Sequence, residues 1–163
     1  MHQGIIPGAI GVKDLNLQDS ISFAGRHGFD NVMVNIREVH EIAQQHGTDY
    51  VVDLFGEYGV KPGGWGLPVS WSDDEKRPQG LAELPAFMET ANAIGCNRAT
   101  SGIGPGFDDG TYEARFDRAV QQLGEVAKVL ERYAAARERR TAPAGGSAGQ
   151  AGGPGQAGGT DTR

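Results

Sequence analysis

The sequence predicts an α/β protein that forms part of a (β/α)8 TIM barrel, with about four strand–helix units followed by a disordered tail rich in Gly and Ala. Short apolar runs alternate four times with helical patterns, which is typical of a parallel sheet covered by helices. Residues 1–140 divided by four give 35 residues per unit, close to the roughly 31 per unit of a complete barrel. A doubly wound open sheet is the alternative architecture.

Apolar spacing and turn residues place the predicted elements along residues 1–140. In chain order they are a strand over 5–12, a helix over 16–27, a strand over 29–36, helices over 37–46 and 48–59, a strand over 60–69, a helix over 84–94, a strand over 96–103 and a helix over 112–139.

The elements of the first half have clear boundary signals. Pro7 interrupts the first strand, and Asn16 is a suitable N-cap for the helix that follows it. The apolar run 32–34 is the buried centre of the second strand. Gly47 ends the next helix, and Thr48 is predicted to cap the one after it.

The elements of the second half differ in how clearly they are predicted. Pro62 and the neighbouring glycines weaken the strand over 60–69. Pro85 is placed in the first turn of the helix over 84–94, where its missing N–H costs little, and Gly95 ends that helix. The last helix is the clearest, because apolar residues recur every three or four positions along it: Phe116, Val120, Leu123, Ala127 and Leu130.

Composition restricts the classes of protein. The 15 Lys and Arg against 21 Asp and Glu give a formal charge of −6, which argues against a nucleic-acid binder. Cys96 is the single cysteine, so a disulfide framework and a cysteine zinc site are excluded. The start lacks a secretory signal pattern, and no run is apolar enough for a membrane span, so we expect a cytoplasmic chain. We assign 1–140 to one domain and 141–163 to the disordered tail.

Four segments, in this order and spacing, carry a resemblance to a known family: residues 28–35, 61–68, 93–98 and 123–127. From about residue 8 to about residue 133 the chain resembles the sugar phosphate isomerase/epimerase family, whose fold is the xylose-isomerase-like barrel. This resemblance implies proton transfer next to the carbonyl of a sugar or sugar phosphate, assisted by a divalent metal such as Mn, Mg, Zn or Co.

The same resemblance implies that this chain binds no metal by itself. In the family the metal ligands come mainly from strands five to eight, and strand five is expected just after Tyr133. The chain instead reads Ala134-Ala135-Ala136 and continues with charged residues, so no metal ligand can be transferred to a matching position. Met33 also stands where the family often has an acidic residue.

Candidate substrate-binding residues are those near the carboxyl ends of the predicted strands, because barrel sites form on that face. They are Asn35, Arg37, Trp65, Arg98 and Ser101. For Trp65 an apolar wall for a sugar and a packing role are equally supported, whereas Trp71 is expected to pack. No residue is assigned a catalytic role.

Two other motifs are interpreted as structural. The Gly-rich stretch 102–110 could present N–H groups to a phosphate, but it lacks the dinucleotide fingerprint, so we predict a plain turn. His40 begins a motif that resembles a zinc helix, but Gln44 replaces the second histidine, so we expect His40 and His46 to be solvated.

Two functional hypotheses follow. The first is a sugar isomerase or epimerase represented by the amino-terminal half of its barrel. The second is a truncated or frame-shifted, non-catalytic remnant that self-associates or pairs with another chain, because a half-barrel leaves two strand edges and its interior face open. Nucleic-acid repair, by analogy with endonuclease relatives of the family, is disfavoured by charge and by the missing ligands.

Overall fold

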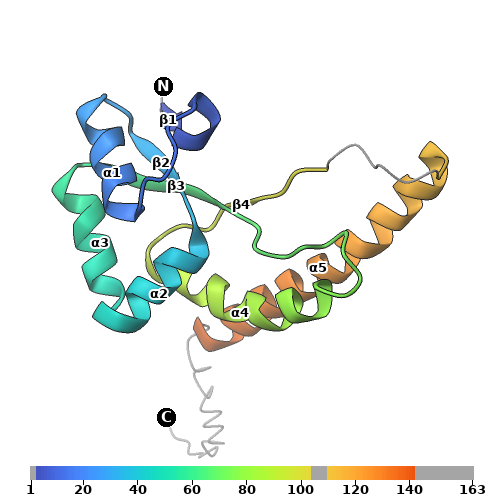
Figure 1. Ribbon diagram of the computed structural model, residues 1–163. Coiled ribbons are helices and arrows are strands. Elements are labelled where there is room, and N and C mark those ends of the chain that lie inside the picture. Colours follow the sequence, from blue (N-terminus) through green and yellow to red (C-terminus); the bar gives the residue numbers. More distant parts are fainter. Residues whose placement is uncertain (1–2, 104–109, 142–163) are drawn as a thin grey trace, which may run out of the picture.

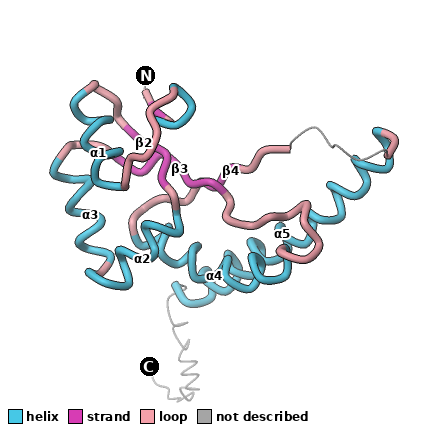
Figure 2. Tube along the Cα trace, viewed as in Figure 1, coloured by secondary structure: helices cyan, strands magenta, loops and turns pink. Residues whose placement is uncertain are grey.

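The protein contains a four-stranded parallel sheet with the strand order β1-β2-β3-β4. A computed structural model describes residues 3–103 and 110–141. The predicted tail and residues 104–109 of the predicted turn lie outside the described residues, apart from Thr141, which is helical. Figure 2 shows how short the strands are: β1 (Gly4–Ile5), β2 (Asn31–Val34), β3 (Lys61–Gly66) and β4 (Ala99–Thr100).

Helices follow each strand, as the alternation predicts. Figure 1 shows α1 and α3 to the left of the strands and α2 and α4 below them, while α5 runs from the far right to a position beside α4. Helix α4 packs against both α2 and α5. The helices are η1 (Pro7–Ile10), α1 (Leu17–Arg26), α2 (Ile36–His46), α3 (Thr48–Glu57), α4 (Arg77–Ala93) and α5 (Tyr112–Thr141). The predicted fold class, part of an α/β barrel, is confirmed.

The helix N-caps agree with the prediction in one case and differ in another. Asn16 caps α1, because its side chain accepts a hydrogen bond from the Asp19 N–H at 2.8 Å. The prediction that Thr48 caps α3 is wrong, since Thr48 is the first helical residue and Gly47 holds the cap position at φ +90°. That left-handed conformation suits glycine and lets α2 end where α3 begins.

Two predicted boundaries near prolines are wrong. The strand over 5–12 ends at Ile5, since Pro7 starts the 3-10 helix η1. Helix α4 begins at Arg77 rather than at Leu84, so Pro85 lies inside the helix and not in its first turn. The predicted strand over 96–103 contains β4 but extends beyond it on both sides.

The core lies between the sheet and the helices. Val32 and Val34 of β2 point to this side and are at most 6% exposed. Ile21 of α1, Val39 of α2 and Val51 of α3 are completely buried against the same core. Cys96 is 2% exposed and packs as a small apolar residue, and burial raises the pKa of its thiol.

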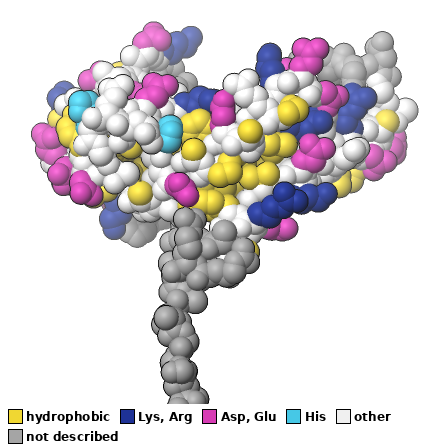
Figure 3. All heavy atoms as spheres, turned by 90° about the horizontal axis from the view of Figure 1, so that it is seen from below, with side chains coloured by type: hydrophobic (Ala, Val, Ile, Leu, Met, Phe, Trp, Pro, Cys, Tyr) yellow, Lys and Arg dark blue, Asp and Glu magenta, His cyan; other side chains and the backbone are white. Residues whose placement is uncertain are grey.

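Helix α5 buries only part of its apolar surface. Val126 and Gln122 are buried, while Phe116 and Val120, at the start of the predicted stripe, are each 55% exposed. Figure 3 shows hydrophobic side chains gathered over the region of α4 and α5. None of the helices in the described residues, including the 30-residue α5, is long and apolar enough to cross a membrane.

Candidate functional site

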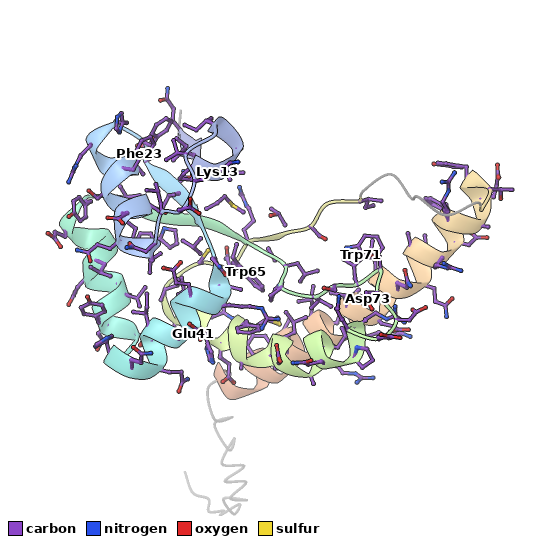
Figure 4. The ribbon with its side chains drawn as sticks, in the orientation of Figure 1. Lys13, Phe23, Glu41, Trp65, Trp71 and Asp73 are labelled. Atoms are coloured by element: carbon purple, nitrogen blue, oxygen red, sulfur yellow. The ribbon has the colours of Figure 1, made fainter. Side chains whose placement is uncertain are left out.

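A cleft of about 690 Å³ lies at the carboxyl ends of β1, β2 and β3. The segment between β1 and α1, the start of α2 and the residues after β3 form its walls. Figure 4 shows Lys13 beside η1, on this part of the molecule. The polar side chains that line the cleft are Lys13, Asp14, Ser20, Asn35, Arg37 and Glu38. In parallel α/β folds, ligands bind at this end of the strands.

Two of the predicted site residues, Asn35 and Arg37, line this cleft. Asn35 follows β2 and caps α2, with its side-chain oxygen accepting the Arg37 N–H at 3.1 Å. The oxygen of Asn35 is therefore occupied, while its amide nitrogen makes no hydrogen bond within the described part of the chain and is the group suited to a ligand. The sequence pattern predicted the position of Asn35 but not its capping role.

The guanidinium of Arg37 is held by three contacts. It donates to Glu83 Oε2 at 2.8 Å and to the Pro68 carbonyl oxygen at 2.9 Å, and it lies 4.9 Å from the centre of the Phe87 ring. These contacts join the start of α2 to α4 and to the residues after β3. Hydrogen bonds from Gln79 and then Arg37 hold the pKa of Glu83 below its ordinary value.

The helix N-termini beside the cleft are already bonded by side chains of this chain. Glu38 Oε1 accepts the Leu17 N–H at 2.7 Å, in addition to the Asn16 cap of α1, and Asn35 caps α2. A free helix N-terminus is a common binding site for phosphate. Here three of those donors, the N–H groups of Leu17, Asp19 and Arg37, are occupied, which makes these helix ends less suited to an anion.

The charges that line the cleft balance. Lys13 and Arg37 are cationic, while Asp14 and Glu38 are anionic. Glu83 pairs with Arg37, which reduces the attraction of that guanidinium for a further anion. Balanced charge and a set of hydroxyl, amide and carboxylate groups suit an uncharged, hydroxyl-bearing ligand better than a phosphate.

Trp65 does not line this cleft. It is 3% exposed and packs on the helix side of the sheet, where its ring N–H donates to the Cys96 carbonyl oxygen at 3.3 Å. The pairing of β2 with β3 shifts between Val32 and Met33, so Gly63 and Gly64 both lie on the opposite face and Trp65 turns toward the helices. Figure 4 shows Trp65 between the strands and α2 and α4.

Ser101 and Arg98 are also separate from the cleft. Ser101 follows β4 and accepts a hydrogen bond from the Trp71 ring N–H at 3.0 Å. Arg98 precedes β4 and lines a smaller cavity of about 340 Å³ near the amino ends of β2 and β3, together with Asp30 and Lys61. The structure therefore brings together two of the five predicted residues, Asn35 and Arg37.

Sequence reasoning missed the cleft residues that precede α1. Lys13 and Asp14 lie in a turn where Asp14 has φ +60°, a left-handed backbone that aspartate tolerates better than most residues. They directly follow the predicted strand over 5–12, so their place at its carboxyl end was the signal that could have found them.

The prediction that His40 is a solvated histidine is wrong. Its Nδ1 lies 2.7 Å from Thr90 Oγ1 of α4, and its ring meets the edge of Phe87 at 5.3 Å. His40 therefore belongs to the contact between α2 and α4. His46 is exposed, as predicted, and lies beside Tyr50.

A divalent metal does not fit the described residues. Within 3–103 and 110–141, no three His, Cys, Asp or Glu side chains are grouped closely enough to hold an ion. Asp14 and Glu38 line the cleft, but Glu38 is bonded to the start of α1. We therefore derive no proton-transfer step through a metal on these residues.

Comparison with solved structures confirms the fold. The chain is similar to a xylose isomerase domain protein from Alicyclobacillus acidocaldarius, with 22% identity and a TM-score of 0.64 over 79% of this chain and 46% of that one. It is similar to the IolI protein with a bound zinc atom, with 19% identity and a TM-score of 0.64 over 82% of this chain and 49% of that one. A third match is the 3-keto-D-glucoside 4-epimerase YcjR from E. coli, with 12% identity and a TM-score of 0.53 over 82% and 52% of the two chains.

These matches define a xylose-isomerase-like TIM barrel, of which this chain has about half. The chain spans about half the length of the structures it matches. No protein-family model matches it, and no curated protein matches its sequence. At identities of 22% and below, the likeness shows the fold.

Proposed function

We propose that this chain provides the substrate-binding half of a barrel that isomerises or epimerises a sugar, and that its cleft binds the sugar in an uncharged form. The observation that carries the proposal is the 690 Å³ cleft at the carboxyl ends of β1 to β3, where barrel enzymes bind their substrates. The similar structures include a 3-keto-D-glucoside 4-epimerase and a xylose isomerase domain protein, which supports a carbohydrate as the ligand class.

The cleft residues have defined roles in this proposal. The amide nitrogen of Asn35 donates to a sugar hydroxyl, the Ser20 hydroxyl donates or accepts, and the Asp14 carboxylate accepts from a sugar hydroxyl. Arg37 is a positioning residue, because its contacts to Glu83 and Pro68 hold the start of α2 in place. The capped helix N-termini and balanced charges disfavour a sugar phosphate.

A second candidate function is pairing without catalysis. The outer edges of β1 and β4 carry no partner strand among the residues that the structure describes. Unpaired parallel edges are sites for association with another chain. In this reading the chain acts as one half of an assembly, and proton transfer would require acidic and imidazole groups from the other half.

The binding proposal is tested by NMR titration of the labelled chain with free ketoses and aldoses and with their phosphates. We expect the amides of the cleft, such as those of Asp14 and Arg37, to shift with a free sugar more than with its phosphate. Asn35→Asp keeps the oxygen that caps α2 and removes the amide donor, so the affinity should fall by about threefold to tenfold.

The matched control is Asn16→Asp, which makes the same change at the cap of α1 in a residue that does not line the cleft. This variant should bind the sugar as the wild type does. The proposal is wrong if no cleft amide responds to any free sugar, if phosphates bind more tightly, or if the two variants lose the same affinity.

A further inference from the structure

The face of the sheet opposite the helices carries large and small residues on alternate strands. β2 contributes Asn31 and Met33, whereas β1 and β3 contribute glycines. A Cβ at Gly4 or Gly63 would collide with the side-chain oxygen of Asn31, and one at Gly64 would lie 3.0 Å from Met33 Sδ. This alternation is how a closed barrel fills its interior, in layers supplied by every second strand.

The two outer edges of the sheet complement each other. Within the described residues β1 pairs with β2 alone and β4 pairs with β3 alone, and all pairs are parallel. The free edge of β4 can therefore form a parallel pair with the free edge of β1, since each has the hydrogen-bonding groups that the other needs. Two such sheets related by a twofold axis along the strands would join β4 to β1 at both seams and keep eight strands parallel.

Exposed apolar side chains concentrate in the segments that follow the two edge strands. Of the eight large hydrophobic residues that are exposed in the described part of the chain, two follow β1, one follows β4 and three lie on α5, and the other two are Tyr50 and Val52. The six are Ile6, Ile10, Ile103, Tyr112, Phe116 and Val120. Exposed apolar surface concentrated in this way is typical of an interface.

The placement of α5 follows the pattern of the other units. Helix α1 follows β1 and contacts β2, and α3 lies between β2 and β3 in sequence and contacts β3. Each of these helices thus packs against the next strand of the sheet. By the same pattern α5 should pack against a strand beyond β4, and its exposed Phe116 and Val120 are suited to that contact.

We propose that a second copy of this chain completes the barrel, with β4 of each copy pairing with β1 of the other and α5 covering the seam. The chain spans 46–52% of the solved barrels it matches, so two copies supply the length of one. Twice four strands also gives the eight of a closed α/β barrel. This proposal names the partner in the pairing candidate above and does not depend on sugar binding.

The first test measures the mass of the full chain by sedimentation equilibrium. We expect a dimer, and Val120→Asp should weaken it by at least about tenfold, because a carboxylate would be buried at the seam. Val52→Asp on α3 is the matched control, since it makes the same change at an exposed valine away from both edges. Both valines are exposed, so circular dichroism should show both variants folded.

The second test establishes which edges meet. Ile6→Cys and Gly102→Cys place thiols after β1 and after β4, and the native Cys96 is buried. A bis-maleimide with a spacer of about 10 Å tolerates register offsets of two or three residues. We expect covalent dimers when the two single variants are mixed and little product from either variant alone, because identical edges lie on opposite sides of the proposed barrel.

The outcomes separate this proposal from its alternatives. A monomeric wild type, or equal behaviour of Val120→Asp and Val52→Asp, would overturn it. Cross-linking of Gly102→Cys with itself would indicate two β4 edges meeting, which also overturns it. A dimer that forms normally while no sugar shifts the cleft amides would contradict the binding proposal and leave this one standing.

Discussion

Arg37 joins the cleft to the helix layer. Its guanidinium reaches Glu83 on α4 and the Pro68 carbonyl after β3, and both contacts are under 3 Å. Asn35, two residues earlier, holds the start of α2. Two neighbouring side chains therefore fix the wall of the cleft where β2 ends. A ligand bound there would lie beside the contact between α2 and α4.

The Arg37–Glu83 pair predicts a pH dependence of stability. The pKa of Glu83 is lowered from its ordinary value of 4.5 by hydrogen bonds from Gln79 and Arg37. A lowered pKa stabilises the folded state above the unfolded pKa, and this stabilisation is lost as the pH falls through the folded value. The wild type should therefore be more stable than Glu83→Gln at pH 7, and this difference should shrink toward zero below about pH 4.

Thermal unfolding of both proteins from pH 7 to pH 3 checks this prediction. The comparison cancels the other acidic groups whose pKa is lowered, Asp73 and Asp74, which are present in both proteins. A difference that stays constant over the whole range would show that the Glu83 charge does not matter.

Helix α4 contains a proline in its interior. Pro85 lies inside it and cannot donate to the carbonyl oxygen one turn earlier. Gly80 lies in the same helix where a Cβ would come within 3.1 Å of Val69, so the start of α4 approaches the chain after β3 closely. Helix α4 is nevertheless central to the molecule, since it packs between α2 and α5.

Pro85→Ala should stabilise the protein. The new N–H gains a helical partner, and the steric conflict of the proline ring disappears, so the free energy of unfolding should rise by about 1–3 kcal/mol. Urea unfolding measures this change. The control is Pro78→Ala, since Pro78 lies in the first turn, where no helical bond is missing, and its replacement should change stability by less than about 1 kcal/mol.

How far the elements could be predicted depends on their local signals. The caps at Asn16 and Gly47 and the long repeat of α5 are local, and they located α1, α2 and α5 well. The start of α4 could not be predicted, because residues 77–83 have no apolar repeat and are held by contacts distant in sequence. Arg77, for example, bonds to Glu125 of α5 at 2.9 Å.

The residues of the candidate site could be predicted only where the end of a strand could be predicted. Asn35 and Arg37 follow a well-predicted strand, and both line the cleft. Trp65 could not be oriented, because the register shift in β3 moves its side chain to the helix side, and a shift of one residue reverses the face of every later side chain. Lys13 and Asp14 also follow a predicted strand end but were not singled out, and the observed strand ends earlier, at Ile5.

Half of a barrel has two outer strand edges and one sheet face that are not covered by the described residues of the same chain. Glycines at Gly4 and Gly64 let Asn31 and Met33 lie flat over that face. The exposed apolar residues lie mainly in the segments that follow the two edge strands. Both features are explained if the sheet is completed by another copy.

The proposed assembly predicts that the unfolding temperature depends on concentration. Mass action stabilises a dimer, so the midpoint of the wild type should rise by roughly 1–3 °C for each tenfold increase in protein. Val120→Asp should lose this dependence, whereas Val52→Asp should keep it. Calorimetry over a hundredfold range of concentration checks this, and a midpoint that does not move in the wild type would contradict the assembly.

The two tryptophans give the protein a built-in optical readout. Trp65 is buried beside Cys96, and Trp71 lies half-buried next to Ser101, beyond the end of β4. Figure 4 shows them in separate parts of the molecule. The variant Trp71→Phe would keep only Trp65, whose fluorescence would report on unfolding of the core. The variant Trp65→Phe would keep only Trp71, whose fluorescence would report on changes near the end of β4.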